Sequence, residues 1–227
     1  ALQIAERLIG LGLCPVALRS PNDPSEQQKP AAKRGKTPFQ RGWQSAPVPR
    51  SADDLDLTPD LNVGVRTGKT GAEFELVAAD IDSEESARWA EAHLPPTPVK
   101  TYSGRAEAGW RGQHWFYKRP AGDSAVGNRA RISVRGADGK DKVLSIDVKA
   151  DGGQVVAPGS VHGTGGAYEE VQPWTRDLLA LLPAFDWAWF PAPAEDEVPS
   201  AADLFGAGAA EDRELEALLA HPKNSQH

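Results

Sequence analysis

The chain has 227 residues, with 25 Lys and Arg against 32 Asp and Glu, and a formal net charge of −7. This length fits one large domain or two small ones, since domains typically hold roughly 100–200 residues. The single cysteine, Cys14, excludes an internal disulfide and any zinc site built from several cysteines. No apolar run approaches the roughly 18–20 residues that cross a bilayer. The N-terminus lacks the pattern of a signal peptide, so we expect a cytoplasmic protein with no membrane partner.

The acidic net charge argues at first against a nucleic-acid binder, but it hides blocks of opposite sign. Residues 1–50 and 100–150 carry +5 and +6, whereas residues 51–99 and 151–227 carry −8 and −10. Of the total, −6 belongs to residues 192–227, so the rest of the chain sums to −1. Net charge therefore does not exclude nucleic acid, and we expect phosphate contacts in the two basic blocks.

In the N-terminal third, helical spacing of apolar residues predicts a helix over residues 2–13 that Pro15 ends. Residues 20–50 are rich in Pro, Gly, Lys and Arg and predict a loop of a length that is usually functional or disordered. RTGKTG at 66–71 lacks the Walker spacing and precedes a strand, which excludes a P-loop. The other elements expected up to residue 94 are strands at 16–18, 61–68 and 74–82, a helix start at 51–56, and a helix at 83–94 that Ser83 caps.

The second half of the chain predicts mainly strands. These lie at residues 99–104, 114–118, 143–150 and 154–162, and a short helix covers 177–182. The turn Asp151-Gly152-Gly153 predicts that the last two strands pair as a hairpin. From residue 192 the composition is that of an acidic linker, followed by a helix-like stretch. Clustered antiparallel strands mixed with helices predict the α+β class.

Asp80 and Asp82 form the first candidate site. Alternate residues of a strand share a face, so both carboxylates project the same way while Ile81 points into the core. Carboxylates about 6–7 Å apart on one face repel each other unless a cation joins them. Mg²⁺ and Mn²⁺ favour carboxylate oxygens. The pattern therefore indicates a divalent metal site, with a solvated strand end as the alternative.

Asp147 is the second candidate. It shares a strand face with Ser145 and Lys149, in the middle of a short apolar run. Burying an unpaired charge is costly, so this carboxylate needs a partner. We expect either a third metal ligand or an ion pair with Lys149 or a nearby Arg.

The third candidate is His114, in Arg111-Gly112-Gln113-His114 before an aromatic strand. It could bind phosphate or transfer a proton, and the alternative is a hydrogen-bonded structural histidine. His162, in a loop beside Ser160, could contact an anion or could be part of an ordinary surface loop.

The order of these motifs resembles the bifunctional primase–polymerase (prim-pol) branch of the archaeo-eukaryotic primases. The matching pieces run from GLCPVAL, GKTPFQRGWQ and NVGVRTG to the Asp-x-Asp strand, the small-x-His turn and SIDVKADGGQVVAPGSVH. The resemblance covers roughly residues 5–190. It implies a primase-type catalytic core, with an antiparallel RRM-like sheet, helices and an N-terminal αβ unit. We expect this catalytic domain over residues 1–191, with residues 192–227 as an acidic linker and the start of a C-terminal helical segment.

The resemblance also implies template-dependent primer synthesis and DNA polymerisation in phage or plasmid replication. Asp80, Asp82 and Asp147 would hold two divalent ions, Mg²⁺ or Mn²⁺, for two-metal nucleotidyl transfer. His114 would bind the incoming triphosphate. Further nucleotide contacts would come from Arg111, Gly112, Gln113, Lys149, Ser160 and His162.

Two departures from relatives matter. Gly112 stands where many relatives carry Ser, so one hydroxyl contact would be missing. Some plasmid relatives carry a zinc-binding stem with several cysteines, and Cys14 alone cannot build one, so we expect no zinc. The implied partners are a single-stranded DNA template, NTP or dNTP, and a helicase module in the same full-length chain of a bacterial or phage-infected host cell. The alternatives are a non-catalytic single-stranded DNA-binding module and a metal-dependent phosphodiesterase.

Overall fold

A small antiparallel sheet and one helix form the N-terminal unit of this computed structural model, which describes residues 1–105, 110–122, 124–135 and 141–191. Helix α1 (Leu2–Gly10) leads into β1 (Pro15–Leu18), which pairs with β2 (Asn62–Arg66). β2 also pairs with β9 (Gln154–Val156), giving the order β1-β2-β9. The expected N-terminal αβ unit is therefore confirmed, with one strand supplied by the distant C-terminal half.

The larger sheet has five strands in the order β10-β4-β5-β3-β8, and every pairing is antiparallel. β3 lies between β5 and β8, so the strand that carries Asp80 has neighbours on both sides. The strand bounds are β3 Leu76–Ile81, β4 Lys100–Tyr102, β5 Gln113–Lys118, β8 Ile146–Lys149 and β10 Glu169–Glu170.

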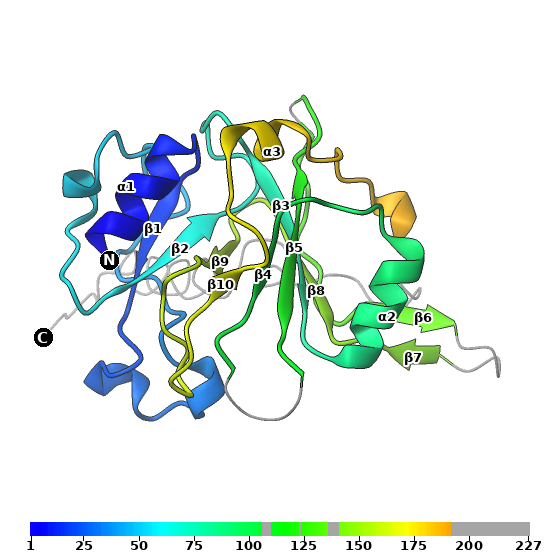
Figure 1. The fold of residues 1–227 in the computed structure, drawn as a ribbon, viewed down its shortest axis with the longest axis horizontal. Coiled ribbons are helices and arrows are strands. Elements are labelled where there is room, and N and C mark those ends of the chain that lie inside the picture. Colours follow the sequence, from blue (N-terminus) through cyan, green and yellow to red (C-terminus); the bar gives the residue numbers. More distant parts are fainter. Residues whose placement is uncertain (106–109, 123, 136–140, 192–227) are drawn as a thin grey trace, which may run out of the picture.

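Each face of the five-stranded sheet packs against a different layer (Figure 1). One face meets the small sheet and α1 across a core that includes Leu8, Val65, Leu76 and Phe116. The other face is covered by α2 (Glu84–His93) and packs around residues such as Trp115. Burial of apolar surface on both faces stabilises the sheet. β3 therefore presents alternate side chains to two different cores.

Short elements complete the fold. Ser83 caps α2 by accepting a hydrogen bond from the Ser86 N–H (3.2 Å). The remaining elements are α3 (Arg176–Ala180), the β6–β7 pair (Ser133–Arg135 and Asp141–Val143), and the 3-10 turns η1 (Pro24–Glu26), η2 (Ala31–Lys33), η3 (Ala52–Leu55) and η4 (Trp187–Trp189). Within the described ranges, no helix is long and apolar enough to cross a membrane.

The structure confirms the α+β class and most expected elements, but not the hairpin. β8 pairs with β3 in the large sheet, whereas β9 pairs with β2 in the small one. Gly152, at φ +74°, does make the expected turn, yet the turn carries the chain from one sheet to the other. The first helix is also shorter than predicted. It ends at Gly10, because Gly12 at φ +79° turns the chain before Pro15.

The long loop over residues 20–50 is structured by local contacts. Its backbone joins the small sheet where the Phe39 N–H donates to Ala17 O (2.8 Å) and the Arg19 N–H donates to Thr37 O (2.8 Å). Glu26 is buried and pairs with Lys29 (2.8 Å). The predicted acidic linker at 192–227 lies outside the described residues, so the domain boundary stays a prediction.

Candidate active site

Polar residues form one continuous row across the large sheet. Asp147 on β8 lies directly opposite Asp80 on β3, which lies opposite His114 on β5, which lies opposite Thr101 on β4. Directly paired residues of antiparallel strands point to the same face. This face is the one turned towards the small sheet, because Ala78, two residues from Asp80, lies in the core between the sheets. Asp80 and Asp147, which are 67 positions apart in the sequence, therefore lie side by side on neighbouring strands.

Asp80 and His114 are held together inside the row. His114 Nε2 lies 3.4 Å from Asp80 Oδ1, while Nδ1 lies 3.1 Å from the Thr101 hydroxyl. Tyr168 stacks on the imidazole, with ring centroids 5.9 Å apart. Burial alone would raise the pKa of Asp80, but the interactions with His114 first and then with Lys149 outweigh burial and lower this pKa to about 2. Asp80 is thus an ionised carboxylate at any physiological pH.

Asp82 follows directly after β3 and extends its ladder, since its N–H donates to Ser145 O (2.8 Å). Its carboxylate is half exposed and lies 3.6 Å from Arg105. Burial first, and repulsion by Asp80 second, raise the pKa of Asp82, although Lys36 and Arg105 oppose this shift. The repulsion shows that the two carboxylates act on each other, which is the electrostatic condition expected of a cation site.

Asp147 is paired within the structure as it stands. Its carboxylate accepts from Lys149 Nζ (2.9 Å) and from the Arg131 N–H (3.0 Å). Burial would lower the pKa of Lys149, but Asp147 and then Asp80 outweigh this effect and raise it. Arg131 adopts a left-handed φ of +53° to present its N–H, a conformation that costs energy in a non-glycine residue. Of the two alternatives for Asp147, the ion pair with Lys149 is present in the structure, and the metal-ligand role stays a prediction.

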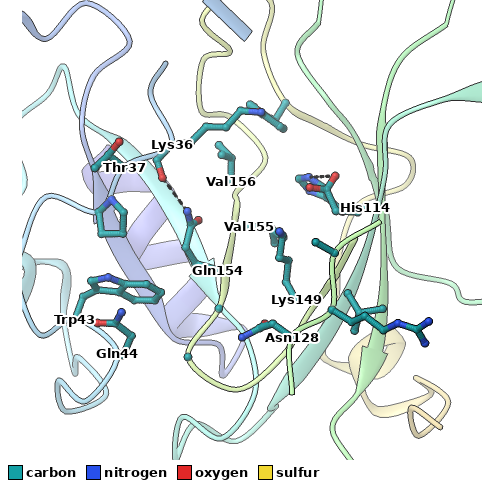
Figure 2. A pocket seen from close by; sticks show the side chains of 18 of the residues that line it. Lys36, Thr37, Trp43, Gln44, His114, Asn128, Lys149, Gln154, Val155 and Val156 are labelled. Carbon is teal, nitrogen blue, oxygen red and sulfur yellow. Dashed lines mark hydrogen bonds and ion pairs between the residues drawn. The ribbon is translucent and has the colours of Figure 1, made fainter. Parts of the chain in front are cut away.

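A cavity of about 590 Å³ lies between the two sheets at this row. Asp80, His114 and Lys149 line it from the large sheet, and residues 152–156 line it from the turn and β9. The opposite wall comes from the loop before β2, including Trp43 (Figure 2). Small-molecule sites typically have volumes of about 300–1,000 Å³, so the cavity is large enough for a nucleotide.

The family comparison agrees with this arrangement. A family model described as "Bifunctional DNA primase/polymerase, N-terminal" (Prim-Pol) matches residues 1–187. The chain belongs to the Prim-Pol family. Membership implies DNA primase/polymerase activity in general, and with it a DNA template and nucleotide substrates. A search of curated proteins found no match.

Two of the residues expected to contact nucleotide in the Prim-Pol domain, Arg111 and Gln113, are placed differently from His114. The Arg111 guanidinium donates to Ser103 O (2.8 Å) and Ala167 O (3.0 Å) and pairs with Glu169 (2.6 Å). Gln113 lies opposite Ile81, so it points to the α2 side, where its Oε1 accepts from Trp115 Nε1 (2.8 Å). Neither residue lines the cavity, and their nucleotide contacts stay predictions.

Gly112 lies close to Asp82. A Cβ built on Gly112 would lie 3.0 Å from Ser103 Oγ and 3.3 Å from Asp82 Oδ1. The Ser103 hydroxyl is buried without a hydrogen-bond partner in the described part of the chain. A hydroxyl is therefore present next to the position where Gly112 lacks one.

Ser160 and His162 are buried beside the Prim-Pol site and do not line the cavity. The Ser160 hydroxyl donates to Val63 O (2.9 Å) and accepts from the Val63 N–H (2.9 Å), which ties the chain after β9 to β2. His162 Nδ1 contacts the Thr164 hydroxyl at 2.9 Å. In the structure both side chains hold segments together, and their role as ligand contacts remains untested.

Acid should destabilise the domain through His162. Burial first, then Lys36 and Arg105, lower the pKa of His162 to about 4 from an ordinary value of 6.5. Between about pH 6.5 and 4 the unfolded chain therefore binds a proton that the folded chain does not. This stabilisation is complete above pH 6.5 and is lost as the pH falls towards 4, by about 3 kcal/mol. Urea unfolding at several pH values should show a shallower pH dependence for His162→Gln, and parallel curves would contradict this.

The acids fit a divalent ion in part. Asp80 and Asp82 supply two carboxylates that repel each other, the donor chemistry that Mg²⁺ and Mn²⁺ prefer. Among the described residues, no three His, Cys, Asp or Glu side chains stand close enough together to form a complete metal cluster. Asp147 would have to leave Lys149 to join them.

Several residues of the Prim-Pol cavity were not identified as site residues from the sequence. Lys36, Trp43 and Gln44 come from the loop over residues 20–50, and Tyr168 comes from the segment before β10. The motif GKTPFQRGWQ was the available signal for the first three, because it combines cations, an amide and an indole in a loop too long to be a simple connection. Tyr168 and Thr101 carried no such signal.

Proposed function

We propose that this Prim-Pol domain synthesises primers on a single-stranded DNA template and extends them with nucleotides. The reaction is nucleotidyl transfer, in which a 3′-hydroxyl oxygen bonds to the α-phosphorus of the incoming nucleotide and pyrophosphate leaves. The observation that carries the proposal is that Asp80 and His114, neighbours in a row that Asp147 extends, line a cavity of about 590 Å³. It supports the activity that the family implies.

Asp80, Asp82 and Asp147 would hold two divalent ions, either Mg²⁺ or Mn²⁺. When bound, such ions lower the pKa of the attacking hydroxyl and neutralise charge on the phosphates. In the free protein, Lys149 forms an ion pair with Asp147 and helps to lower the pKa of Asp80. Its positive charge therefore already offsets part of the negative charge of these acids. Its ammonium would pass to the triphosphate when Asp147 changes partner.

His114 would bind the triphosphate of the incoming nucleotide. Thr101 engages Nδ1, which leaves Nε2 turned to Asp80 at the cavity. The hydroxyl and the stacked Tyr168 restrict how the imidazole can turn. A donor fixed in this way requires little reorganisation when charge develops on the phosphates.

The wider setting is also part of the proposal. The domain would act in phage or plasmid replication, in the cytoplasm of a bacterial or phage-infected cell, with a helicase module in the same full-length chain. Lys and Arg contacts to template phosphates would make DNA binding fall with rising salt.

An end-labelled primer on a longer template tests the proposal. With Mn²⁺ or Mg²⁺ and dNTPs we expect lengthening, and with an unprimed template and labelled NTPs and dNTPs we expect new short products. Shortening of the primer without nucleotides would indicate a phosphodiesterase instead. A mobility shift of the DNA with no change of length in either metal would indicate a binding module and overturn the proposal.

A further inference from the structure

The wall of the cavity opposite the acids carries its own set of side chains. Trp43 and Gln44 lie across the cavity from His114, and Lys36 extends along its upper edge (Figure 2). All three come from one stretch of the loop between β1 and β2. None of the three acids or His114 belongs to that stretch, so this wall is separate from the proposed catalytic row.

Hydrogen bonds from β2 and β9 hold this wall in place. The buried Arg66 guanidinium donates to Ala46 O (2.7 Å) and to Gln44 O, directly after Trp43. Gln154 Nε2 donates to Lys36 O (2.8 Å), which fixes the other end of the stretch to β9. Burying this charge costs desolvation, and two of its hydrogen bonds hold loop carbonyls while a third reaches Cys14 Sγ (3.4 Å). A loop anchored in this way is preorganised, and preorganisation lowers the cost of binding a ligand.

The polar groups of this wall lack partners within the described part of the chain. Among the described residues, none forms a hydrogen bond or ion pair with the Lys36 ammonium, the Trp43 indole N–H or the Gln44 carboxamide. Trp43 is half-buried against the cluster of Val16, Leu18, Val156 and Tyr168, yet no ring or cation pairs with its indole. The wall therefore offers one cation and one aromatic surface to the cavity.

We propose that Trp43 stacks on the base of the incoming nucleotide while Lys36 binds its phosphates. This inference rests on the proposed function and adds two nucleotide contacts from the loop. Trp43 lies on the wall opposite the acids, and Lys36 lies at the edge of the cavity, near enough to Asp80 and Asp82 for its positive charge to favour their ionised forms. Stacking suits a template-directed enzyme, because every base has a π-face and an indole accepts all of them. Selection among bases is thereby left to pairing with the template.

Binding of dATP and of inorganic tripolyphosphate to the full chain, measured by calorimetry in Mg²⁺, tests the proposal. Trp43→Leu keeps apolar packing but removes the aromatic face, so dATP should bind about 10-fold more weakly, with tripolyphosphate unaffected. Trp43→Phe should restore most of the dATP affinity. Lys36→Met should weaken both ligands. Trp187→Leu, on the α2 side of the large sheet, is the matched control and should change neither.

Two results would overturn the proposal. One is unchanged dATP affinity in a folded Trp43→Leu variant, and the other is equal weakening of dATP and tripolyphosphate by that variant. Both measurements are independent of catalysis. If Trp43→Leu weakens dATP binding but the wild-type domain never lengthens a primer, the proposed function alone is refuted. If the wild-type domain lengthens primers but Trp43→Leu leaves dATP affinity unchanged, this inference alone is refuted.

Discussion

Asp80→Asn should lower the rate of nucleotide incorporation by at least about 1,000-fold, which corresponds to about 4 kcal/mol of transition-state stabilisation. Asn keeps the shape of the side chain and can still contact His114, 3.4 Å away, but it removes the negative charge that a divalent ion requires. The fold should survive, because the row retains Asp147 with Lys149. Single-turnover primer extension gives the rate, and thermal unfolding by circular dichroism checks the fold.

Asp53→Asn is the matched control for Asp80→Asn. Asp53 is exposed in the short turn η3 and lies outside the cavity. The same chemical change there should leave incorporation within about twofold of wild type, since substitutions at exposed positions usually have small effects. Normal incorporation by a folded Asp80→Asn variant would exclude Asp80 as a metal ligand.

His114→Gln should reduce kcat/KM for the incoming nucleotide by about 100-fold, or about 2.7 kcal/mol. The imidazole is buried, fixed by Thr101 and faces the cavity, so glutamine cannot place a donor at the same point with the same rigidity. The loss should appear mainly as a higher KM, because the proposed contact is already made to the bound triphosphate. Steady-state extension at varied dNTP concentration separates the two parameters.

His93→Gln is the control for His114→Gln. His93 is exposed at the end of α2 and stacks on Trp89, on the far side of the large sheet. Its replacement should leave both kinetic parameters near wild type. If His114→Gln has the same kinetics as His93→Gln, the imidazole in the row does not bind the nucleotide.

Local sequence patterns predict much of the fold. The alternation in β3 correctly predicts that Ile81 is buried in the core and that Asp80 lies on the other face, because strand periodicity fixes which side chains share a face. The Ser83 cap and the buried aromatic strand with Trp115 also follow from local chemistry. These features depend on neighbours in sequence and so could be predicted.

Pairing between distant strands could not be predicted in the same way. The turn at Gly152 has the composition of a hairpin, but Asp151 accepts from Arg119 (3.0 Å) and from the Val126 N–H (2.8 Å). These contacts, far apart in sequence, fix the turn as a crossing between sheets. The register that sets Asp147 opposite Asp80 depends on that crossing, so the acids could be named as candidates but not placed side by side.

The positions of the loop side chains that line the cavity could not be predicted for a related reason. Residues 36–44 have no periodicity, and their backbone is fixed by Arg66 of β2 and Gln154 of β9, two strands that come later in the chain. Strands as short as β10, with two residues, fall below any pattern of alternation. Asp80, Asp82, Asp147 and His114 could therefore be named as candidates from the sequence, whereas the side chains that face them across the cavity could not be placed.

The most direct test of the proposed site is the anomalous diffraction signal of Mn²⁺ in crystals grown with a non-hydrolysable deoxynucleoside triphosphate. We expect manganese bound to Asp80 and Asp82, with the triphosphate beside His114 in the cavity between the sheets. Asp147 should have left Lys149. A structure with nucleotide bound and no manganese at Asp80 and Asp82, or with the nucleotide outside this cavity, would contradict it.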